Sequence, residues 1–205
     1  MRIAFIVEGK TEKAFMPYLR NYLKNHLEGR MPKLDPVPYD GPIPTESKLQ
    51  REVANLLEDR KNPADHVIAL TDVYTGKRPP DFTDAKDAKK KMRDWVGAEA
   101  RFHPHAAQYE FEAWLLPYWP DIQKLARHKK KGPDGKPETV DHENPPSSRI
   151  KEIFRIGGCR NDYVKVRDAG RILREKDLSI AIAECPELKA FVNTILSICG
   201  GKVIP

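Results

Sequence analysis

The feature that most constrains the fold is an uninterrupted apolar run near the start of the chain, Ile3 to Val7, that stops at a carboxylate, Glu8. A second apolar run, Val67 to Leu70, is followed by Asp72. Short runs that are apolar on both faces and rich in β-branched residues are typical of strands buried on both sides, which occur in parallel sheets covered by helices. The chain is therefore expected to form an α/β fold in which both runs are central strands.

The segments around these runs predict further elements. Apolar residues recur at helical spacing from Ala14 to Leu27, after Thr11, whose hydroxyl is expected to cap the helix, and Pro17 is expected to kink or delay it. Two further extended pieces are expected at Val37 to Tyr39 and Phe102 to Tyr109. The remaining helices are expected at Glu46 to Lys61, Asp84 to Val96, Phe111 to Leu116, Arg149 to Phe154, Ala169 to Lys176, Leu178 to Ala183 and Pro186 to Cys199.

A chain of 205 residues can bury one sizeable core and a small appendage. Residues 1–122 are expected to form the main domain and residues 147–205 a helical C-terminal extension packed on it. Between them, residues 123–146 include six basic residues and one Asp from Lys124 to Lys136, which predicts a basic flexible loop.

Charge and cysteine content set broad limits on function. Lys and Arg outnumber Asp and Glu by 36 to 30, and this moderate basic bias is compatible with a polyanionic partner without demonstrating one. Three widely spaced cysteines fit neither a disulfide framework nor a four-ligand zinc site. No signal peptide or membrane span is recognisable, so a cytoplasmic location is expected.

Glu8 and Asp72 mark the expected functional site, because the crevice of an α/β sheet lies at the carboxyl ends of its strands. Glu12 follows one helical turn after Glu8. Carboxylates gathered in one crevice repel one another unless a cation lies between them, and their oxygens suit Mg²⁺ or Mn²⁺. In the alternative interpretation these residues only stabilise helix N-termini, and the spacing leaves both open. A phosphate-binding loop at Gly9-Lys10-Thr11 is excluded, because Ala4 occupies the position of the first glycine.

Several blocks of sequence resemble a known group. They are Val7-Glu8-Gly9-Lys10-Thr11-Glu12, Thr71-Asp72-Val73-Tyr74, Gln108-Tyr109-Glu110-Phe111-Glu112-Ala113-Trp114-Leu115-Leu116, Pro137-Glu138-Thr139, Pro146-Ser147-Ser148-Arg149-Ile150, Tyr163-Val164-Lys165 and Cys185-Pro186. These blocks resemble a Toprim-type domain, the fold of topoisomerases, primases and OLD nucleases. The match is closer to a Toprim-related bacterial family of unknown function, number 4276.

The resemblance implies a Toprim-like, mainly parallel sheet with a Mg²⁺ centre. Glu8 would be the general acid or base, Asp72 would hold Mg²⁺ and Glu12 a second metal ion. Toprim enzymes usually carry Asp-x-Asp at the second strand, whereas this chain has Tyr74 at the last position, so Glu110 and Glu112 are candidates for the missing ligand.

Two basic residues in the matching blocks are candidates for contacts with phosphate. Lys165 would stabilise charge on a phosphoryl oxygen, and Arg149 would clamp a phosphate. The alternative for each is an ordinary surface side chain.

Basic residues outside the acidic site could follow a nucleic-acid backbone, although charge runs are usually solvated faces. The residues predicted to bind nucleic acid are Lys10, Lys89, Lys90, Lys91, Lys129, Lys130, Lys131 and Arg149. Trp95, Trp114 and Trp119 are expected to anchor the core. His103 and His105, on one face of a strand, are expected to be surface or packing residues.

The function expected from these features is metal-dependent cleavage of DNA or RNA. The resemblance also implies an ATPase partner in bacterial defence against phage. Two alternatives stay open: a non-catalytic interaction or regulatory subunit that retains the scaffold, and a phosphohydrolase of small nucleotides.

Overall fold

The computed structural model describes residues 1–29, 31–39, 41–74, 80–139, 143–158 and 162–205. The side chain of Lys10 also lies outside the described part, so its predicted contact with nucleic acid is not addressed by the structure. Pro79 and Cys159 lie in the gaps as well.

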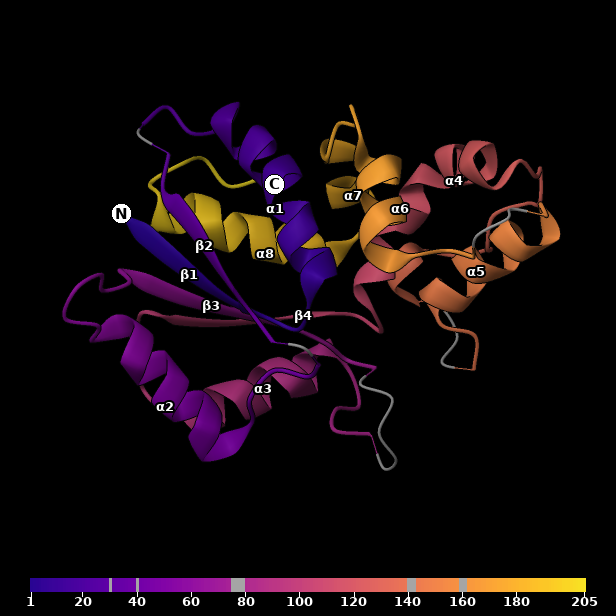
Figure 1. Ribbon diagram of the computed structural model, residues 1–205. Helices are drawn as coiled ribbons and strands as arrows, with labels where there is room; N and C mark the ends of the chain where they lie inside the picture. The colour runs from indigo at the N-terminus through magenta and orange to yellow at the C-terminus, as the bar shows by residue number, and fades with distance from the viewer. Residues whose placement is uncertain (30, 40, 75–79, 140–142, 159–161) are drawn as a thin grey trace.

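The centre of the molecule is a four-stranded, entirely parallel sheet (Figure 1). Its strands are β1 (Arg2–Val7), β2 (Lys33–Pro38), β3 (His66–Asp72) and β4 (Phe102–Ala107), in the order β2-β1-β3-β4. The two apolar runs form the central strands β1 and β3, with Phe5 beside Ile68 and Val7 beside Leu70. Parallel neighbours end at the same edge of a sheet, so the residues that follow β1 and β3 are brought together.

Helices cover both faces of the sheet, which explains why β1 and β3 are apolar on both sides (Figure 1). On one face, α2 (Glu46–Leu57) and α3 (Ala85–Val96) pack against strand residues such as Ala4 and Ile6. On the other, α1 (Lys10–Lys24) and α8 (Pro186–Ile198) pack against residues such as Phe5. The predicted fold class, a parallel α/β sheet flanked by helices, is confirmed.

The rest of the second half forms a helical lobe beside the carboxyl ends of the strands (Figure 1). It contains the 3₁₀ helices η1 (Phe111–Tyr118) and η2 (Pro137–Thr139) and the helices α4 (Trp119–Ala126), α5 (Pro146–Ile156), α6 (Lys165–Leu173) and α7 (Ser179–Glu184). After α7 the chain returns to the sheet as α8, where Phe191 meets Phe5 with ring centroids 6.0 Å apart. One continuous apolar core therefore joins lobe and sheet. The division at residues 122 and 147 stays a prediction, and α4 crosses the first boundary.

The expected cap of α1 was wrong. The helix begins at Lys10 with Gly9 as its cap residue, so Thr11 lies inside the helix and cannot cap it. Instead, Glu12 Oε2 accepts a hydrogen bond of 3.0 Å from the Gly9 amide. The helix also runs through Pro17 without a break in its assignment.

The helix predicted at Phe111 is present as the 3₁₀ helix η1. It contains Pro117, which lacks an amide donor. In the described ranges no helix is long and apolar enough to cross a membrane.

Candidate acidic site

Glu8 and Asp72 lie side by side at the carboxyl ends of β1 and β3. The Asp72 amide donates a hydrogen bond of 2.8 Å to Glu8 Oε1, and the Thr71 hydroxyl donates one of 2.5 Å to the same oxygen. Both carboxylates are only partly exposed. The end of β3 thus fixes the carboxylate that follows β1.

The segment after β4 enters the same site. The Phe111 amide donates a hydrogen bond of 2.8 Å to Asp72 Oδ1, which places the start of η1 against the Asp72 carboxylate. On either side of Phe111, Glu110 and Glu112 are buried. The sequence could only suggest that these two glutamates reach the crevice of Glu8 and Asp72, and the structure brings them there.

Lys165, the first residue of α6, supplies a positive charge to this group of acids. Its Nζ lies 3.2 Å from Glu112 Oε2 and 3.9 Å from Glu110 Oε1. Burial lowers the pKa of Lys165, but the negative charges of Glu112, Glu110 and Asp72 outweigh this effect and raise the pKa overall. Lys165 therefore remains a cation at any physiological pH.

The acids of this site are hard to ionise together. Burial raises the pKa of Glu8 to about 7 against the opposing hydrogen bonds from Thr71 and Asp72, and the charge of Glu12 adds to the increase. Burial and the charges of Glu8, Glu12 and Glu112 hold the pKa of Asp72 well above its ordinary value. Burial likewise raises the pKa of Glu12 and of Glu112. Burial is the main cause at all four acids, and the charges of neighbouring carboxylates add to it at Glu8, Asp72 and Glu112.

Further side chains support the acids, and their pairing could not be read from the sequence. The Ser147 amide and hydroxyl donate hydrogen bonds of 2.9 and 3.0 Å to the two oxygens of Glu110. The Tyr163 hydroxyl donates one of 3.3 Å to Glu112 Oε1. Ser147 and Tyr163 stand in the blocks that resemble a known family, but only the fold shows which carboxylate each one holds.

The described carboxylates do not form a closed protein cage for a metal ion. Within the described ranges, no three or more His, Cys, Asp or Glu side chains are grouped closely enough to hold a metal ion by themselves. Mg²⁺, however, is usually held by one or two carboxylates together with waters and substrate phosphates. The hydrogen bonds found among described residues reach one oxygen each of Glu8 and Asp72, which leaves the second oxygen available. Glu12 as a ligand of a second metal ion stays a prediction.

Tyr74 occupies the position at which Toprim enzymes usually have a second aspartate. Its side chain is 44% exposed, and its amide donates a hydrogen bond of 2.7 Å to the Tyr109 carbonyl. Tyr109 has a φ of +69°, a left-handed conformation that is unusual for a bulky residue. A strained backbone and an exposed aromatic ring thus border the acidic site.

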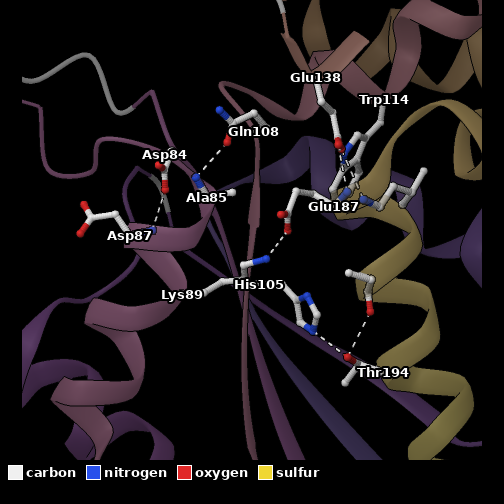
Figure 2. A network of polar contacts seen from close by, with 12 residues as sticks. Asp84, Ala85, Asp87, Lys89, His105, Gln108, Trp114, Glu138, Glu187 and Thr194 are labelled. Atoms are coloured by element: carbon white, nitrogen blue, oxygen red, sulfur yellow. Dashed lines mark hydrogen bonds and ion pairs between the residues drawn. The ribbon is translucent and has the colours of Figure 1, made fainter. Parts of the chain in front are cut away.

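Most of the basic residues predicted to bind nucleic acid have acidic partners within the protein. Lys89 of α3 reaches Glu187 of α8 at 2.5 Å, past β4 (Figure 2). The other ion pairs are Lys90 with Asp94 at 2.7 Å, Lys91 with Asp87 at 2.8 Å, Lys130 with Glu152 at 2.5 Å and Lys131 with Asp134 at 2.7 Å. Arg149 Nε donates to the Asn144 carbonyl, and Lys129 is exposed. Binding of nucleic acid by these residues stays a prediction.

The histidines and two tryptophans have structural surroundings. His105 is buried beside α8, where its Nε2 lies 3.0 Å from Thr194 Oγ1 (Figure 2). His103 Nε2 lies 3.2 Å from His66 Nδ1. Trp114 and Trp119 are buried, which confirms their predicted role as core anchors.

The fold as a whole is shared with two solved structures. The structure is similar to the C-terminal region of the Burkholderia pseudomallei OLD protein, with a TM-score of 0.50 and 16% identity over 96% of this chain and 95% of that one. It is also similar to the C-terminal region of the Xanthomonas campestris pv. campestris OLD protein, with a TM-score of 0.50 and 14% identity over 97% and 96% of the two chains. At such low identity the likeness establishes the fold alone.

Residues 7–196 match the family described as "Domain of unknown function (DUF4276)", and the chain belongs to this family. The suspected membership is thereby confirmed. No curated protein matches the sequence.

Proposed function

We propose that this protein is a metal-dependent nuclease of the Toprim type that hydrolyses phosphodiester bonds in DNA or RNA. The observation that carries the proposal is the Glu8 and Asp72 pair at the carboxyl ends of adjacent parallel strands, joined by the hydrogen bond from the Asp72 amide to Glu8. The raised pKa values of both carboxyls and the proximity of Lys165 suit a site that receives a divalent cation and a phosphate.

Each residue has a distinct role in this proposal. Glu8, with a pKa of about 7, can take up or release a proton near neutral pH, as a general acid or base must. Lys165 presents a fixed positive charge to a phosphoryl oxygen. Asp72 would hold Mg²⁺ or Mn²⁺ through its free oxygen. When bound, the metal ion would neutralise charge on the phosphate and make water a better nucleophile.

The test is cleavage of plasmid DNA, single-stranded DNA and RNA with Mg²⁺ or Mn²⁺, comparing the wild type with Glu8→Gln and Asp72→Asn. We expect each variant to lose activity by at least about a hundredfold, the scale associated with removing general acid–base catalysis. Asp134→Asn is the matched control, because it also neutralises one carboxylate but on an exposed loop. Equal activity of all three variants would exclude the site.

A non-catalytic interaction subunit is the second candidate, favoured by Tyr74 in place of a carboxylate. Asp72 and Glu110 would then serve only to hold the N-termini of η1 and α5. This alternative predicts no cleavage, alone or with a cognate ATPase, and no binding of Mn²⁺ by calorimetry. The ATPase partner, a role in defence against phage and a cytoplasmic location are parts of the proposal that rest on the resemblance to OLD nucleases.

A further inference from the structure

A surface cavity of about 690 Å³ lies along one face of α5, outside the acidic site. Ser148, Lys151, Glu152 and Arg155 line it, and their spacing of three and four residues places them on one stripe of the helix. The opposite stripe of α5 is buried in the core. Asn144 and Asp162 complete the lining.

Two segments of the chain connect the cavity and the acidic site in sequence. Ser148 lines the cavity, while its neighbour Ser147 holds Glu110 through its amide and hydroxyl. Asp162 also lines the cavity, while its neighbour Tyr163 donates to Glu112. An extended molecule bound in the cavity would therefore contact residues that are next in sequence to those that support the acids.

The lining of this cavity carries two cations, Lys151 and Arg155, and two carboxylates, Glu152 and Asp162. Lys130 forms an ion pair with Glu152, and this hydrogen bond is the main cause that lowers the pKa of Glu152. The charges of Arg155 and Arg149 lower it further. Lys151 and Arg155 are exposed, and in the described part of the chain no ion pair or side-chain hydrogen bond engages either of them. The lysines of α3 differ in this respect, because Lys89, Lys90 and Lys91 each have an acidic partner.

We propose that the α5 cavity binds the phosphodiester backbone of the nucleic acid next to the bond that is cut, with Lys151 and Arg155 as the phosphate contacts. This inference rests on the proposed nuclease function and identifies the surface along which the substrate lies. It replaces the α3 lysines as the expected binding surface, since free cations can neutralise phosphates and release counterions without first breaking an ion pair.

The test separates binding from cleavage. A labelled single-stranded oligonucleotide is titrated by fluorescence anisotropy in Glu8→Gln protein without divalent metal, at several salt concentrations. Lys151→Ala with Arg155→Ala should weaken binding by tenfold or more. It should also reduce the slope of log K against log salt by about 0.7 for each phosphate that is no longer neutralised. Both residues are exposed, so the melting temperature should not change.

Lys90→Ala with Lys91→Ala on α3 is the matched control, because it removes the same charge from cations that already have partners. Equal weakening by both double variants would show a general charge effect and overturn the inference, as would no weakening by the α5 variant. Weaker binding by the α5 variant, but not by the α3 variant, supports the inference. If the wild type also cuts nothing, only the nuclease proposal fails. Cleavage that is unaffected by the α5 variant, at substrate concentrations below saturation, leaves the nuclease proposal intact and overturns this one.

Discussion

Two regions of this protein bury carboxylates near a lysine, but they differ in how far hydrogen bonds stabilise the buried negative charge. Beside β4, Glu138 accepts a hydrogen bond of 2.9 Å from Trp114 Nε1 and others from the amides of Glu187 and Leu188 (Figure 2). At the carboxyl ends of β1 and β3, by contrast, burial raises the pKa of both Glu8 and Asp72, and the charge of Glu8 raises that of Asp72 further.

The two regions differ in how the cost of burying a carboxylate is offset. Burial raises the pKa of Glu138 too, but donors from three residues oppose the shift, and Glu138 thereby ties η2 to η1 and α8. Repulsion at Glu8 and Asp72 has no such structural benefit. In the proposed function, a bound cation would relieve this repulsion.

The largest effect on stability is expected at Glu138. Glu138→Ala leaves the Trp114 indole and the first amides of α8 without an acceptor, at a cost of about 2–4 kcal/mol of unfolding free energy. Urea denaturation at neutral pH measures this cost. An effect below about 1 kcal/mol would remove the distinction between the two regions.

His105 should make the β4 region sensitive to acid. Burial lowers its pKa to about 3, and the charges of Lys89, His103 and Arg93 add to the shift. Between pH 6.5 and pH 3 the unfolded chain binds a proton here that the folded protein does not, so stability falls as pH decreases. His105→Leu should reduce this destabilisation between pH 6.5 and pH 4 by about 3 kcal/mol, measured by denaturation at both values. Parallel pH curves for both proteins would show that the folded histidine titrates normally.

Glu8 should show the opposite pH dependence. Between its ordinary pKa of 4.5 and about 7 the folded protein holds a proton that the unfolded chain has released, so stability falls as pH rises. Glu8→Gln should therefore stabilise the metal-free protein at pH 8 by about 1 kcal/mol and have little effect at pH 4.5. Thermal melts with a chelator test this, and destabilisation at pH 8 would mean that the Glu8 charge is already balanced.

The smallest effect is expected from the ion pair between Lys89 and Glu187. Both side chains are partly exposed, so a double-mutant cycle with Lys89→Met and Glu187→Gln should give a coupling energy of about 0.5–1 kcal/mol. The same substitution at Lys90, whose pair with Asp94 is largely exposed to solvent, is the control. Coupling as small as that of the Lys90 pair would show that the link between α3 and α8 contributes little.

The sequence was informative where a local pattern determines the structure. The runs before Glu8 and Asp72 are apolar on both faces, and such runs fit few places other than the centre of a parallel sheet. That pattern was enough to predict the sheet and the neighbouring positions of these two acids. The predicted cap of α1 was wrong because Thr11 and Glu12 are both capable of capping, and only the backbone conformation of Gly9 decides between them.

Partners that lie far apart in the chain could not be predicted. Nothing near Lys89 in the sequence identifies Glu187 as its partner, so the α3 lysines resembled a free basic surface. Glu110 and Glu112 were ambiguous for the same reason, because their place depends on the turn at Tyr109 and on contacts with Ser147 and Lys165. The side of α5 that borders the acidic site became visible only once the lobe was folded.

The amides of Phe111 and Ser147 donate hydrogen bonds to Asp72 and Glu110, so they can serve as spectroscopic probes of the acidic site. Each amide belongs to the first turn of a helix, and each is held by a carboxylate whose charge would be shared with an arriving cation. Amide resonances and hydrogen-exchange rates at these two positions should therefore respond to occupancy of the site. Cation binding could then be followed residue by residue without any substrate being present.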